Sequence, residues 1–355
     1  MKPSPTLAET GEQALLKRIR RILGPSPAGV IGPGDDTAVL PPGSGSLLAT
    51  TDIQVEGTHF RTGWSRPEET GFKSLTVNLS DIAAMGGRPE YALVSLVLPP
   101  DLPVTAVERL YRGMQKAARP ESVTIVGGNL ARGDRISVTV VLLGALPHGE
   151  PVLRTGARPG DRIFVTGQPG LAHLGLELLG RRPGEPEDLW RPPASRPPAW
   201  RSELTRSHPG SRAALKRFLA PEARLQAARD LALYRPTAMI DVSDGLATDL
   251  HRLTGSGHRF VIDTDSIPRS RGFLRLAEAL EADPISVSLG GGEDYELLLC
   301  LPPSAALRIG RRVVVGGIPL TRIGEVEPGE GVVCRDERGR EAPLVPSGFR
   351  HFAPE

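Results

Sequence analysis

Apolar and polar residues follow two different patterns in the first 150 residues of the chain. Apolar runs bounded by glycine, proline or charged residues predict strands over residues 46–55, 91–99, 123–128 and 136–146. Apolar positions at helical spacing predict an opening helix over residues 10–23, with Thr10 as its N-cap. Further helices are predicted over residues 67–85 and 104–118. Strands and helices therefore alternate through this half of the chain.

The second half begins with a turn rich in proline and glycine, TGARPGDRIFVTGQPG, which leads into a new strand. We place a domain boundary just before it, between an N-terminal domain of residues 1–149 and a C-terminal domain of residues 150–355. The second half repeats the mixture of elements, with helices predicted over 171–180 and 222–233, and strands at the start of 238–253 and over 259–267 and 294–302.

One segment, at about residues 181–212, interrupts this pattern. It is rich in proline and arginine and has no apolar periodicity. The composition predicts an exposed, mobile excursion from the C-terminal domain. We therefore expect that a block deletion of residues 184–210 leaves the rest of the chain folded.

The length of 355 residues is long for a single hydrophobic core and favours two domains. Because each half mixes strands with helices, the sequence predicts an α+β protein with two αβ halves.

Charge and cysteine content exclude several classes of function. Lysine and arginine number 43 against 41 aspartates and glutamates, a net charge of +2, which gives no electrostatic case for nucleic acid or an anionic membrane as a partner. Cys300 and Cys334 are too few for a disulfide framework and lack metal-site spacing. No run of about 18 apolar residues occurs, and the N-terminus lacks the apolar core of a signal peptide. We expect a soluble cytoplasmic protein.

Aspartates occupy comparable places in several motifs. GPGDDTAVL places Asp35 and Asp36 in a loop that enters a strand, and ATTDIQVEGTHF places Asp52 inside an apolar run. VNLSDIAAMGG places Asp81 in an otherwise apolar helix. A carboxylate in such a helix is costly to bury without a partner. Asp81 therefore requires a positive partner.

Few lysines or arginines stand near these acids in the sequence, so a divalent cation is the economical partner. The candidate ligands are all oxygen donors, namely Asp35, Asp36, Thr50, Thr51, Asp52, Asp81, Asp241 and Asp244. Oxygen donors without histidine or cysteine select hard ions, and Mg²⁺ held by a few carboxylates and phosphate oxygens is the usual case. Each aspartate taken alone can also be a turn or cap residue.

Glycine-rich segments add further candidates. VGGN, which ends at Asn129, follows an apolar strand, where free backbone N–H groups can hold an anion. No GxxxxGK[ST] pattern occurs, which excludes a P-loop kinase. In GGGEDYELLLC, Glu293 and Asp294 can be turn residues, or Glu293 can face a cation or a cationic substrate.

The motifs GDDTAVL, TTDIQVEGTHF, VNLSDIAAMGG, GGN, IDVSDGLATDL and GGEDYEL occur in this order over nearly the whole chain. The combination closely resembles the thiamine-monophosphate kinase family of the aminoimidazole ribonucleotide synthetase-like superfamily. The resemblance implies that two-domain fold, with a dimer-forming sheet in the N-terminal mixed αβ domain and a C-terminal αβ domain. It also implies ATP-dependent phosphorylation of thiamine monophosphate to thiamine diphosphate by a homodimer whose N-terminal sheets pair into a barrel.

Matched position by position, the resemblance implies roles for individual residues. Several Mg²⁺ ions would be held by Asp36, Thr50, Thr51, Asp52, Asp81, Asp241 and Asp244. ATP would contact Gly128, Arg154 and Ser243. Thiamine monophosphate would contact His59, Glu293 and Phe349. Glu293 would face the cationic thiamine moiety, for which an ionised carboxylate is a suitable acceptor. His59 can instead be an ordinary hydrogen-bonded histidine, and Phe349 a docking anchor of the tail.

Two positions depart from the family pattern. Asn129 stands where a metal-binding aspartate is expected in the family. Its side-chain carbonyl can still ligate Mg²⁺ and contact ATP, but it carries one negative charge fewer than an aspartate. The usual upstream aromatic residue is replaced around Pro120 and Glu121. Both departures bear on nucleotide affinity rather than on the fold.

Two alternatives stay open, a non-catalytic nucleotide-binding homologue and another ATP-using enzyme of the same superfamily. Selenophosphate synthesis is disfavoured because it requires a reactive residue near the N-terminus, whereas Cys300 and Cys334 stand late in the chain.

Overall fold

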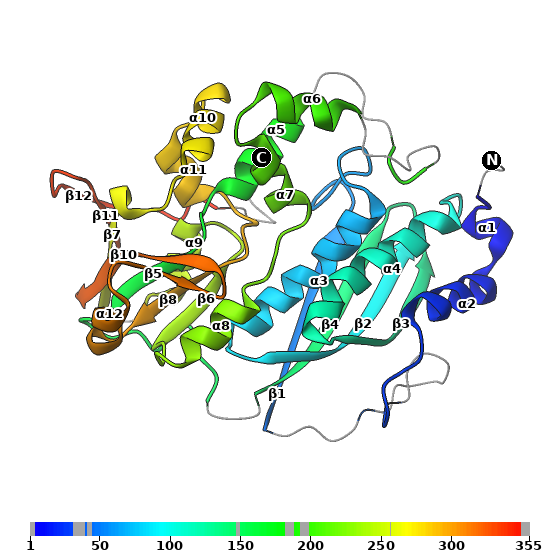
Figure 1. Ribbon diagram of the computed structural model, residues 1–355, viewed down its shortest axis with the longest axis horizontal. Coiled ribbons are helices and arrows are strands. Elements are labelled where there is room, and N and C mark those ends of the chain that lie inside the picture. The colour runs from blue at the N-terminus through cyan, green and yellow to red at the C-terminus, as the bar shows by residue number, and fades with distance from the viewer. Residues whose placement is uncertain are drawn as a thin grey trace. The chain divides into compact units, whose positions relative to one another are not determined.

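The computed structural model describes residues 4–30, 40, 45–146, 150–181, 188–191, 199–255 and 257–348. Three of the candidate residues, Asp35, Asp36 and Phe349, lie outside these ranges. The chain divides into two compact units (Figure 1). Unit 1 spans Met1–Ile82, Gly87–Gly149 and Pro183–Arg201, and unit 2 spans Ala83–Gly86, Glu150–Arg182 and Ser202–Glu355.

Unit 1 contains a four-stranded sheet in the order β1-β4-β2-β3. Its strands are β1 (Ser46–Val55), β2 (Arg88–Leu98), β3 (Thr124–Arg132) and β4 (Ser137–Leu146). β4 pairs antiparallel with β1 and β2, and β2 pairs parallel with β3. The four strands predicted from the sequence are confirmed, and β1 has the predicted bounds.

Helices α3 (Pro67–Ala84) and α4 (Val104–Ala118) cover one face of this sheet, and the short helix η1 (Arg119–Glu121) follows α4 (Figure 1). The two long helices approach closely at glycines on both sides. A Cβ atom on Gly71 would lie 2.0 Å from the carbonyl oxygen of Leu110, and one on Gly113 would lie 2.0 Å from that of Glu68. Only glycine permits this packing, which fixes α3 and therefore Asp81 against the sheet.

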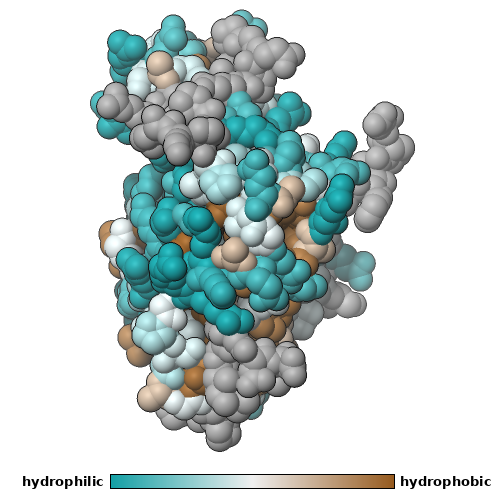
Figure 2. Space-filling view, turned by 90° about the vertical axis from the view of Figure 1, so that its right-hand side faces the viewer, coloured by the Kyte–Doolittle hydropathy of each residue, from teal (hydrophilic) through white to brown (hydrophobic). Residues whose placement is uncertain are grey.

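The N-terminal segment forms two helices, α1 (Leu7–Thr10) and α2 (Glu12–Leu23). Thr6 caps α1 in a reciprocal pair of hydrogen bonds with Glu9. The predicted N-cap at Thr10 is wrong, because Gly11, with φ 74°, ends α1 and precedes α2. Figure 2, viewed from the side that carries α1 and α2, shows a mainly hydrophilic surface with small hydrophobic patches.

The sheet face of unit 1 that points away from α3 and α4, here called the open face, carries exposed apolar side chains. Leu47 and Ile53 of β1 and Leu93 of β2 are 73%, 45% and 36% exposed. On the opposite face of the sheet, residues such as Val140 and Leu142 of β4 are fully buried toward the helices. Exposed apolar residues on one sheet face are typical of an interaction surface.

Unit 2 contains an eight-stranded sheet in the order β12-β11-β7-β10-β5-β8-β6, with β9 paired to β10. Its strands are β5 (Arg162–Thr166), β6 (Ala238–Val242), β7 (His258–Asp263), β8 (Glu296–Leu301), β9 (Arg312–Val315), β10 (Ile318–Pro328), β11 (Gly331–Arg335) and β12 (Glu341–Pro343). Only β7 and β11 pair in parallel among these described strands. Both units mix helices with sheets, which confirms the predicted α+β class.

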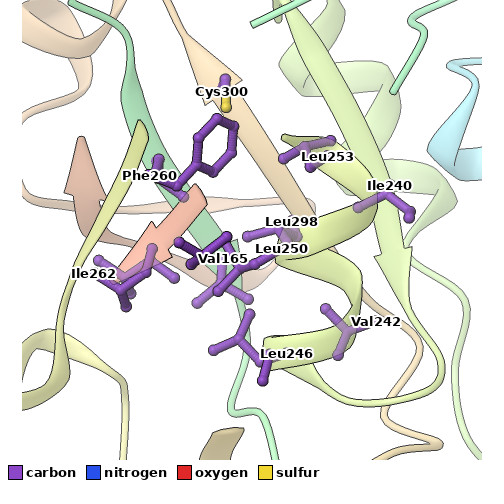
Figure 3. Close-up of a cluster of buried hydrophobic side chains, with 14 of the residues drawn as sticks. Val165, Ile240, Val242, Leu246, Leu250, Leu253, Phe260, Ile262, Leu298 and Cys300 are labelled. Carbon is purple, nitrogen blue, oxygen red and sulfur yellow. The ribbon is translucent and has the colours of Figure 1, made fainter. Parts of the chain in front are cut away.

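The helices of unit 2 include α5 (Leu171–Gly180), α7 (Ser211–Leu219), α8 (Leu225–Ala232), α9 (Leu246–Leu253), η2 (Thr264–Ser266), α10 (Arg271–Ala279), α11 (Pro284–Gly290) and α12 (Pro303–Ile309). Figure 3 shows Leu246, Leu250 and Leu253 of α9 in a buried cluster with strand residues such as Val165 and Leu298. This packing fixes the start of α9 next to the end of β6, where a predicted site motif lies.

Residues 188–191 and 199–201, here called the strap, belong to unit 1, although the sequence predicts that they belong to the C-terminal domain. Leu189 and Trp190 are each only 1% exposed. The end of the strap is helical, because α6 (Ala199–Ser207) begins there. The prediction of an exposed excursion is wrong for Leu189 and Trp190, since two consecutive buried side chains in a turn produce no periodic pattern.

The burial of the strap reverses the expectation for the block deletion. Removing residues 184–210 with a short Gly/Ser join is expected to destabilise unit 1 by about 3 kcal/mol or more, as loss of a buried tryptophan does. Thermal melting checks this. A control in which only residues 192–198 become a Gly/Ser linker keeps the strap, so its melting temperature is expected to stay closer to that of the unaltered chain. Equal melting temperatures for the deletion and the unaltered chain would contradict the assignment.

Candidate active site

In unit 1, β1 and α3 bring two predicted metal ligands into contact. The hydroxyl of Thr50 donates a hydrogen bond to Oδ2 of Asp81 at 2.5 Å. The helix around Asp81 is apolar and buried, as predicted, with Val77 and Ile82 3% and 2% exposed. The pair presents two oxygen donors close enough to share one ion.

The strand register divides the remaining donors of unit 1 between the two faces of the sheet. Asp52 pairs with the buried Val140 and therefore points to the same face as Thr50. Thr51 points to the open face and donates to the carbonyl oxygen of Val140 at 3.1 Å. Asn129 also lies on the open face, in a row with Ile53 that crosses β4 and β2.

Asn129 is three strands away from Asp52, a separation of ~14 Å at the usual strand spacing. Its Oδ1 accepts a hydrogen bond from the N–H of Leu130 at 3.0 Å. Asn129 and Asp52 therefore cannot ligate the same ion within unit 1, and any metal role of Asn129 involves a different ion.

The glycines before Asn129 lie inside β3, which continues to Arg132, so VGGN does not follow the strand as expected from the sequence. A Cβ atom on Gly128 would lie 1.8 Å from the carbonyl oxygen of Val94. The sheet itself therefore requires glycine at this position. A nucleotide contact at Gly128 stays a prediction.

His59 lies in the turn that follows β1. Its ring Nδ1 accepts a hydrogen bond from the backbone N–H of Val55 at 3.1 Å. The backbone N–H of His59 donates to the carbonyl oxygen of Val55 at 2.9 Å. A backbone N–H can only donate, so Nδ1 is an acceptor and the proton of the neutral ring sits on Nε2. His59 therefore presents a donor, which suits an anionic ligand.

In unit 2, the end of β6 and the turn to α9 carry three of the predicted residues. Asp241 is the second-last residue of β6 and is 3% exposed. Ser243 and Asp244 follow, and their N–H groups donate to Oδ2 of Asp249 at 3.1 and 3.2 Å. Asp249, on the first turn of α9, thus fixes the turn that carries the candidate ligands.

An arginine on α9 neutralises part of this acidic turn. Arg252 forms an ion pair with Asp244 and another with Asp249 at 2.8 Å. Burial and the neighbouring charge of Asp244 raise the pKa of Asp249 to about 6, while Arg252 opposes this rise. Sequence reasoning did not identify Asp249 or Arg252, although the spacing of acids in SDGLATD was the available signal.

The segment that carries Glu293 lies against the same turn. The N–H of Glu293 donates to the carbonyl oxygen of Ser243 at 2.7 Å, and Glu293 adopts a φ of 67°. The C-terminal segment joins them, because Gly348 donates to the hydroxyl of Thr248 at 3.0 Å. The structure therefore brings Ser243, Asp244, Glu293 and Gly348 together within unit 2. A left-handed conformation at a non-glycine residue is typical of functional sites.

Asp294 has a structural role. Its carboxylate accepts hydrogen bonds from the N–H groups of Gly170 at 2.5 Å and Ala172 at 2.8 Å, at the start of α5. Burial raises the pKa of Asp294 to about 7 against the effect of these donors. Of the two acids in GGGEDYELLLC, Asp294 is therefore a cap of a distant helix, whereas Glu293 remains the candidate for ligand binding.

Arg154 and Asn78 lie apart from the contacts described above. Arg154 lies exposed in a turn before β5. Asn78, buried on α3, donates to the carbonyl oxygen of Ser74 at 3.0 Å, but its Oδ1 accepts no hydrogen bond from the described residues.

Within the described ranges, no group of three histidine, cysteine or acidic side chains is arranged to hold a metal ion. Nor does any described helix have the length and apolarity to cross a membrane.

Comparison with known proteins agrees with the fold and the motifs. Residues 34–146 match the family described as AIR synthase related protein, N-terminal domain. The chain is 20% identical, with a TM-score of 0.70, to the structure of hydrogenase maturation protein HypE in complex with ATP, covering 95% of each chain. At that identity the likeness concerns the fold alone. Fold and motifs thus define a protein of the AIR synthase related class.

Closer relatives narrow the class. The chain is 35% identical over 347 residues to the thiamine-monophosphate kinase of Aquifex aeolicus, covering 98% of this chain and 99% of the relative. A structure of AaThiL complexed with AMPPCP and TMP is also 35% identical, with a TM-score of 0.72 and coverage of 98% and 99%. The Escherichia coli thiamine-monophosphate kinase is 33% identical, covering 91% of this chain and 92% of the relative. The chain belongs to the thiamine-monophosphate kinase family.

Proposed function

We propose that the chain catalyses the ATP-dependent phosphorylation of thiamine monophosphate to thiamine diphosphate. The observation that carries the proposal is the likeness over nearly the whole chain to a kinase solved with AMPPCP and TMP. For a thiamine-monophosphate kinase these two ligands are an analogue of ATP and the substrate. The reaction transfers a phosphoryl group from one phosphate to another.

The proposed transfer is in line, from the γ-phosphate of ATP to a phosphate oxygen of thiamine monophosphate. A phosphate monoester has a second pKa of about 6, so the acceptor oxygen is already ionised near neutral pH. No general base is therefore required. The protein's task is to position two anions and to neutralise their charge.

Mg²⁺ fits the donors of both units, because these are carboxylates, hydroxyls and an amide without histidine or cysteine. The proposed ligands that the structure describes are Thr50, Thr51, Asp52, Asp81, Asn129, Asp241 and Asp244. The strongest support for this assignment is the Thr50–Asp81 pair, whose oxygens lie 2.5 Å apart. When bound, the ions supply charge neutralisation between the triphosphate and the substrate phosphate. Asp36 belongs to the proposed set and lies outside the described residues.

The proposal assigns ATP contacts to Gly128, Asn129, Arg154 and Ser243. It assigns substrate contacts to His59, Glu293 and the undescribed Phe349. Support comes from the Nε2 donor of His59, which suits a phosphate oxygen, and from the carboxylate of Glu293, which suits a cationic ring. Glu293 is also held against Ser243, a proposed ATP contact.

We further propose that the protein is a homodimer formed through the open face of unit 1. The exposed Leu47, Ile53 and Leu93 support this assignment. In this proposal the N-terminal domain of residues 1–149 supplies dimerisation and part of the metal and nucleotide site. The free state of Cys300 and Cys334 supports a cytoplasmic location.

Product detection tests the proposal. Purified protein is mixed with ATP, Mg²⁺ and thiamine monophosphate, and thiamine diphosphate is measured by chromatography. The expected result is thiamine diphosphate with one ADP per product. Binding of ATP without any product would instead favour a non-catalytic homologue. The negative charge that is missing at Asn129 would then help to explain the loss of activity.

Restoring the charge at position 129 tests the metal assignment there. Asn129→Asp is expected to enlarge the rise in melting temperature on adding Mg²⁺, because a carboxylate adds a full charge at coordination distance. The melting temperature without Mg²⁺ is expected to change little, since Asp52 lies ~14 Å away on the other face and such charges are screened beyond ~8 Å. Gln13→Asp, which adds the same charge at an exposed position of α2, is the control and is expected to leave the Mg²⁺ response unchanged. If Asn129→Asp also leaves it unchanged, Asn129 is not a ligand.

A further inference from the structure

The segment between β1 and α3 carries His59 and has little regular structure of its own. Residues 56–60 are held at one end, where Gly57 donates to the carbonyl oxygen of Phe60 at 2.8 Å and Glu56 donates to that of Ile136 at 2.9 Å. Beyond Phe60, residues 61–65 form turns before α3 begins. His59 is bound to Val55 on one side, and its turn closes at Phe60 on the other, so its position depends on Val55 and on what holds residues 60–65.

The strap supplies hydrogen-bond donors to three carbonyl groups of this segment. Leu189 donates its N–H to the carbonyl oxygen of Thr62 at 2.9 Å. Nε1 of Trp190 donates to that of Ser65 at 3.1 Å. Arg201 donates to that of Trp64. Buried carbonyls without such partners cost free energy, so these donors favour one conformation of the segment.

Aromatic packing links the strap directly to the neighbour of His59. The rings of Trp190 and Phe60 stack with centroids 5.8 Å apart and an interplanar angle of 21°. Phe60 is 5% exposed, so this contact is part of the buried core next to the turn that carries His59. Stacked aromatic pairs contribute beyond their buried area, and the geometry of the pair restricts both rings.

Ion pairs link the strap to α3 and to the turn before α4. Arg201 binds the two carboxylate oxygens of Glu69 at 2.5 and 2.8 Å, with both side chains largely buried. Although burial raises the pKa of Glu69, Arg201 and Arg66 lower it below its usual value. At the other end, Arg191 pairs with Asp101 at 2.9 Å. Residues 188–191 and 199–201 are therefore each linked to unit 1 by an ion pair.

We propose that the strap is a positioning element for substrate binding: by holding residues 60–65 it presents the Nε2 donor of His59 to the phosphate of thiamine monophosphate. This inference rests on the proposed function, in which His59 contacts the substrate. Trp190 acts through its contacts with Phe60 and Ser65. It is a positioning residue for a group that binds the substrate.

Kinetics of a double-mutant cycle test the inference. Trp190→Ala is expected to raise KM for thiamine monophosphate about tenfold, the size of a lost hydrogen bond to a charged group, with KM for ATP changed less than about twofold. His59→Ala is expected to raise the same KM by a similar factor. In the His59→Ala background, Trp190→Ala is expected to add less than about twofold, because the group it positions is already gone. Multiplicative effects of the two changes would overturn the inference.

Two further variants separate positioning from loss of stability. Trp190→Phe keeps the stacking on Phe60 and loses the Nε1 hydrogen bond, so a smaller rise in KM, about threefold, is expected from a variant that folds. Met114→Ala creates a cavity in the buried face of α4 and is the stability control. It is expected to lower the melting temperature and leave KM for thiamine monophosphate unchanged. A rise in KM for Met114→Ala equal to that of Trp190→Phe would overturn the positioning role.

Amide hydrogen exchange distinguishes failure of the inference from failure of the proposed function. In Trp190→Phe, faster exchange is expected in residues 56–65 and unchanged exchange in β1. Unchanged exchange in residues 56–65 would overturn the inference, whether or not the protein is active. If the unaltered protein makes no thiamine diphosphate although the exchange result holds, the proposed function fails and the strap is reduced to a structural clamp, which also overturns its role in substrate binding.

Discussion

Replacing Asp81 by asparagine is expected to abolish thiamine diphosphate formation, with a fall in kcat of about a hundredfold to a thousandfold, the loss seen when one electrostatic contact to a transition state is removed. Asp81 is the proposed metal ligand on α3, and its Oδ2 already lies 2.5 Å from the hydroxyl of Thr50. An asparagine keeps the size and the acceptor for Thr50 but has no negative charge for a hard ion. The fold of unit 1 is therefore expected to survive, because the buried contacts of α3 are unchanged.

Turnover, melting temperature and the Mg²⁺-dependent rise in melting temperature should be measured on the same preparation. The Asp81→Asn variant is expected to melt near the unaltered protein without Mg²⁺ and to respond less to its addition. Asp134→Asn, which changes an exposed acid in the connection from β3 to β4, is the matched control and is expected to change none of the three quantities. An Asp81→Asn variant that is unfolded or fully active would remove Asp81 from the metal site.

The elements that the sequence predicts best are those whose burial repeats at a fixed spacing. β1 has the predicted bounds of residues 46–55, and α4 has those of residues 104–118. In both, one face is buried against a partner and the other is exposed, so the pattern of apolar residues records the element directly. The ends of such elements are also marked by proline, glycine or charged residues.

The strap could not be predicted in this way, because nothing in its own sequence shows what it packs against. Trp190 stacks on Phe60, which stands 130 positions earlier in the chain. Arg201 is neutralised by Glu69, so an arginine that indicated a solvated segment is in fact largely buried. Proline and arginine content describes the tendency of an isolated segment, and tertiary contacts overrode it here.

For the candidate site, the sequence predicts the residue types but not which of them meet. The Thr50–Asp81 pair and the contact of Glu293 with Ser243 join motifs that are far apart in the chain. Asn129 and Asp52 are both candidate Mg²⁺ ligands in the sequence, although strand register puts the two on opposite faces of the sheet. Register depends on pairing between strands, and a single strand's sequence does not state it.

The second large effect concerns a buried ion pair in unit 2 that no motif reasoning identified. Glu296, at the start of β8, is fully buried and binds Nε and Nη2 of Arg224, each at 2.7 Å. It also accepts from the hydroxyl of Thr166 at 2.6 Å and pairs with Arg217 at 3.1 Å. Glu296→Gln would leave the buried guanidinium of Arg224 with only the half-exposed Glu222, at 3.9 Å, as an ion-pair partner. Removing one partner of such a pair is expected to destabilise unit 2 by about 3–5 kcal/mol.

The carboxylate of Glu296 also makes the stability of unit 2 depend on pH in the acidic range. Burial raises the pKa of Glu296, but Arg224 and Arg217 outweigh it and lower that pKa to about 2. Because the folded pKa lies below the unfolded value near 4.5, the stabilisation is present above pH 4.5 and is lost as the pH falls through 2. The difference corresponds to about 3 kcal/mol. Asp294 acts in the opposite sense, since its pKa is raised to about 7 and its contribution is lost as the pH rises through 7.

Chemical denaturation of the unaltered protein and of Glu296→Gln, each from pH 7 down to pH 2, separates these two contributions. The free energy of unfolding of Glu296→Gln is expected to be lower by about 3–5 kcal/mol at pH 7, and the gap is expected to close between pH 4.5 and 2, because the variant has no carboxylate to titrate. Glu222→Gln is the matched control, since Glu222 also pairs with an arginine and a lysine but is half exposed, and a loss below about 1 kcal/mol is expected. A gap that stays constant down to pH 2 would show that Glu296 stabilises unit 2 through packing and hydrogen bonds rather than through its charge.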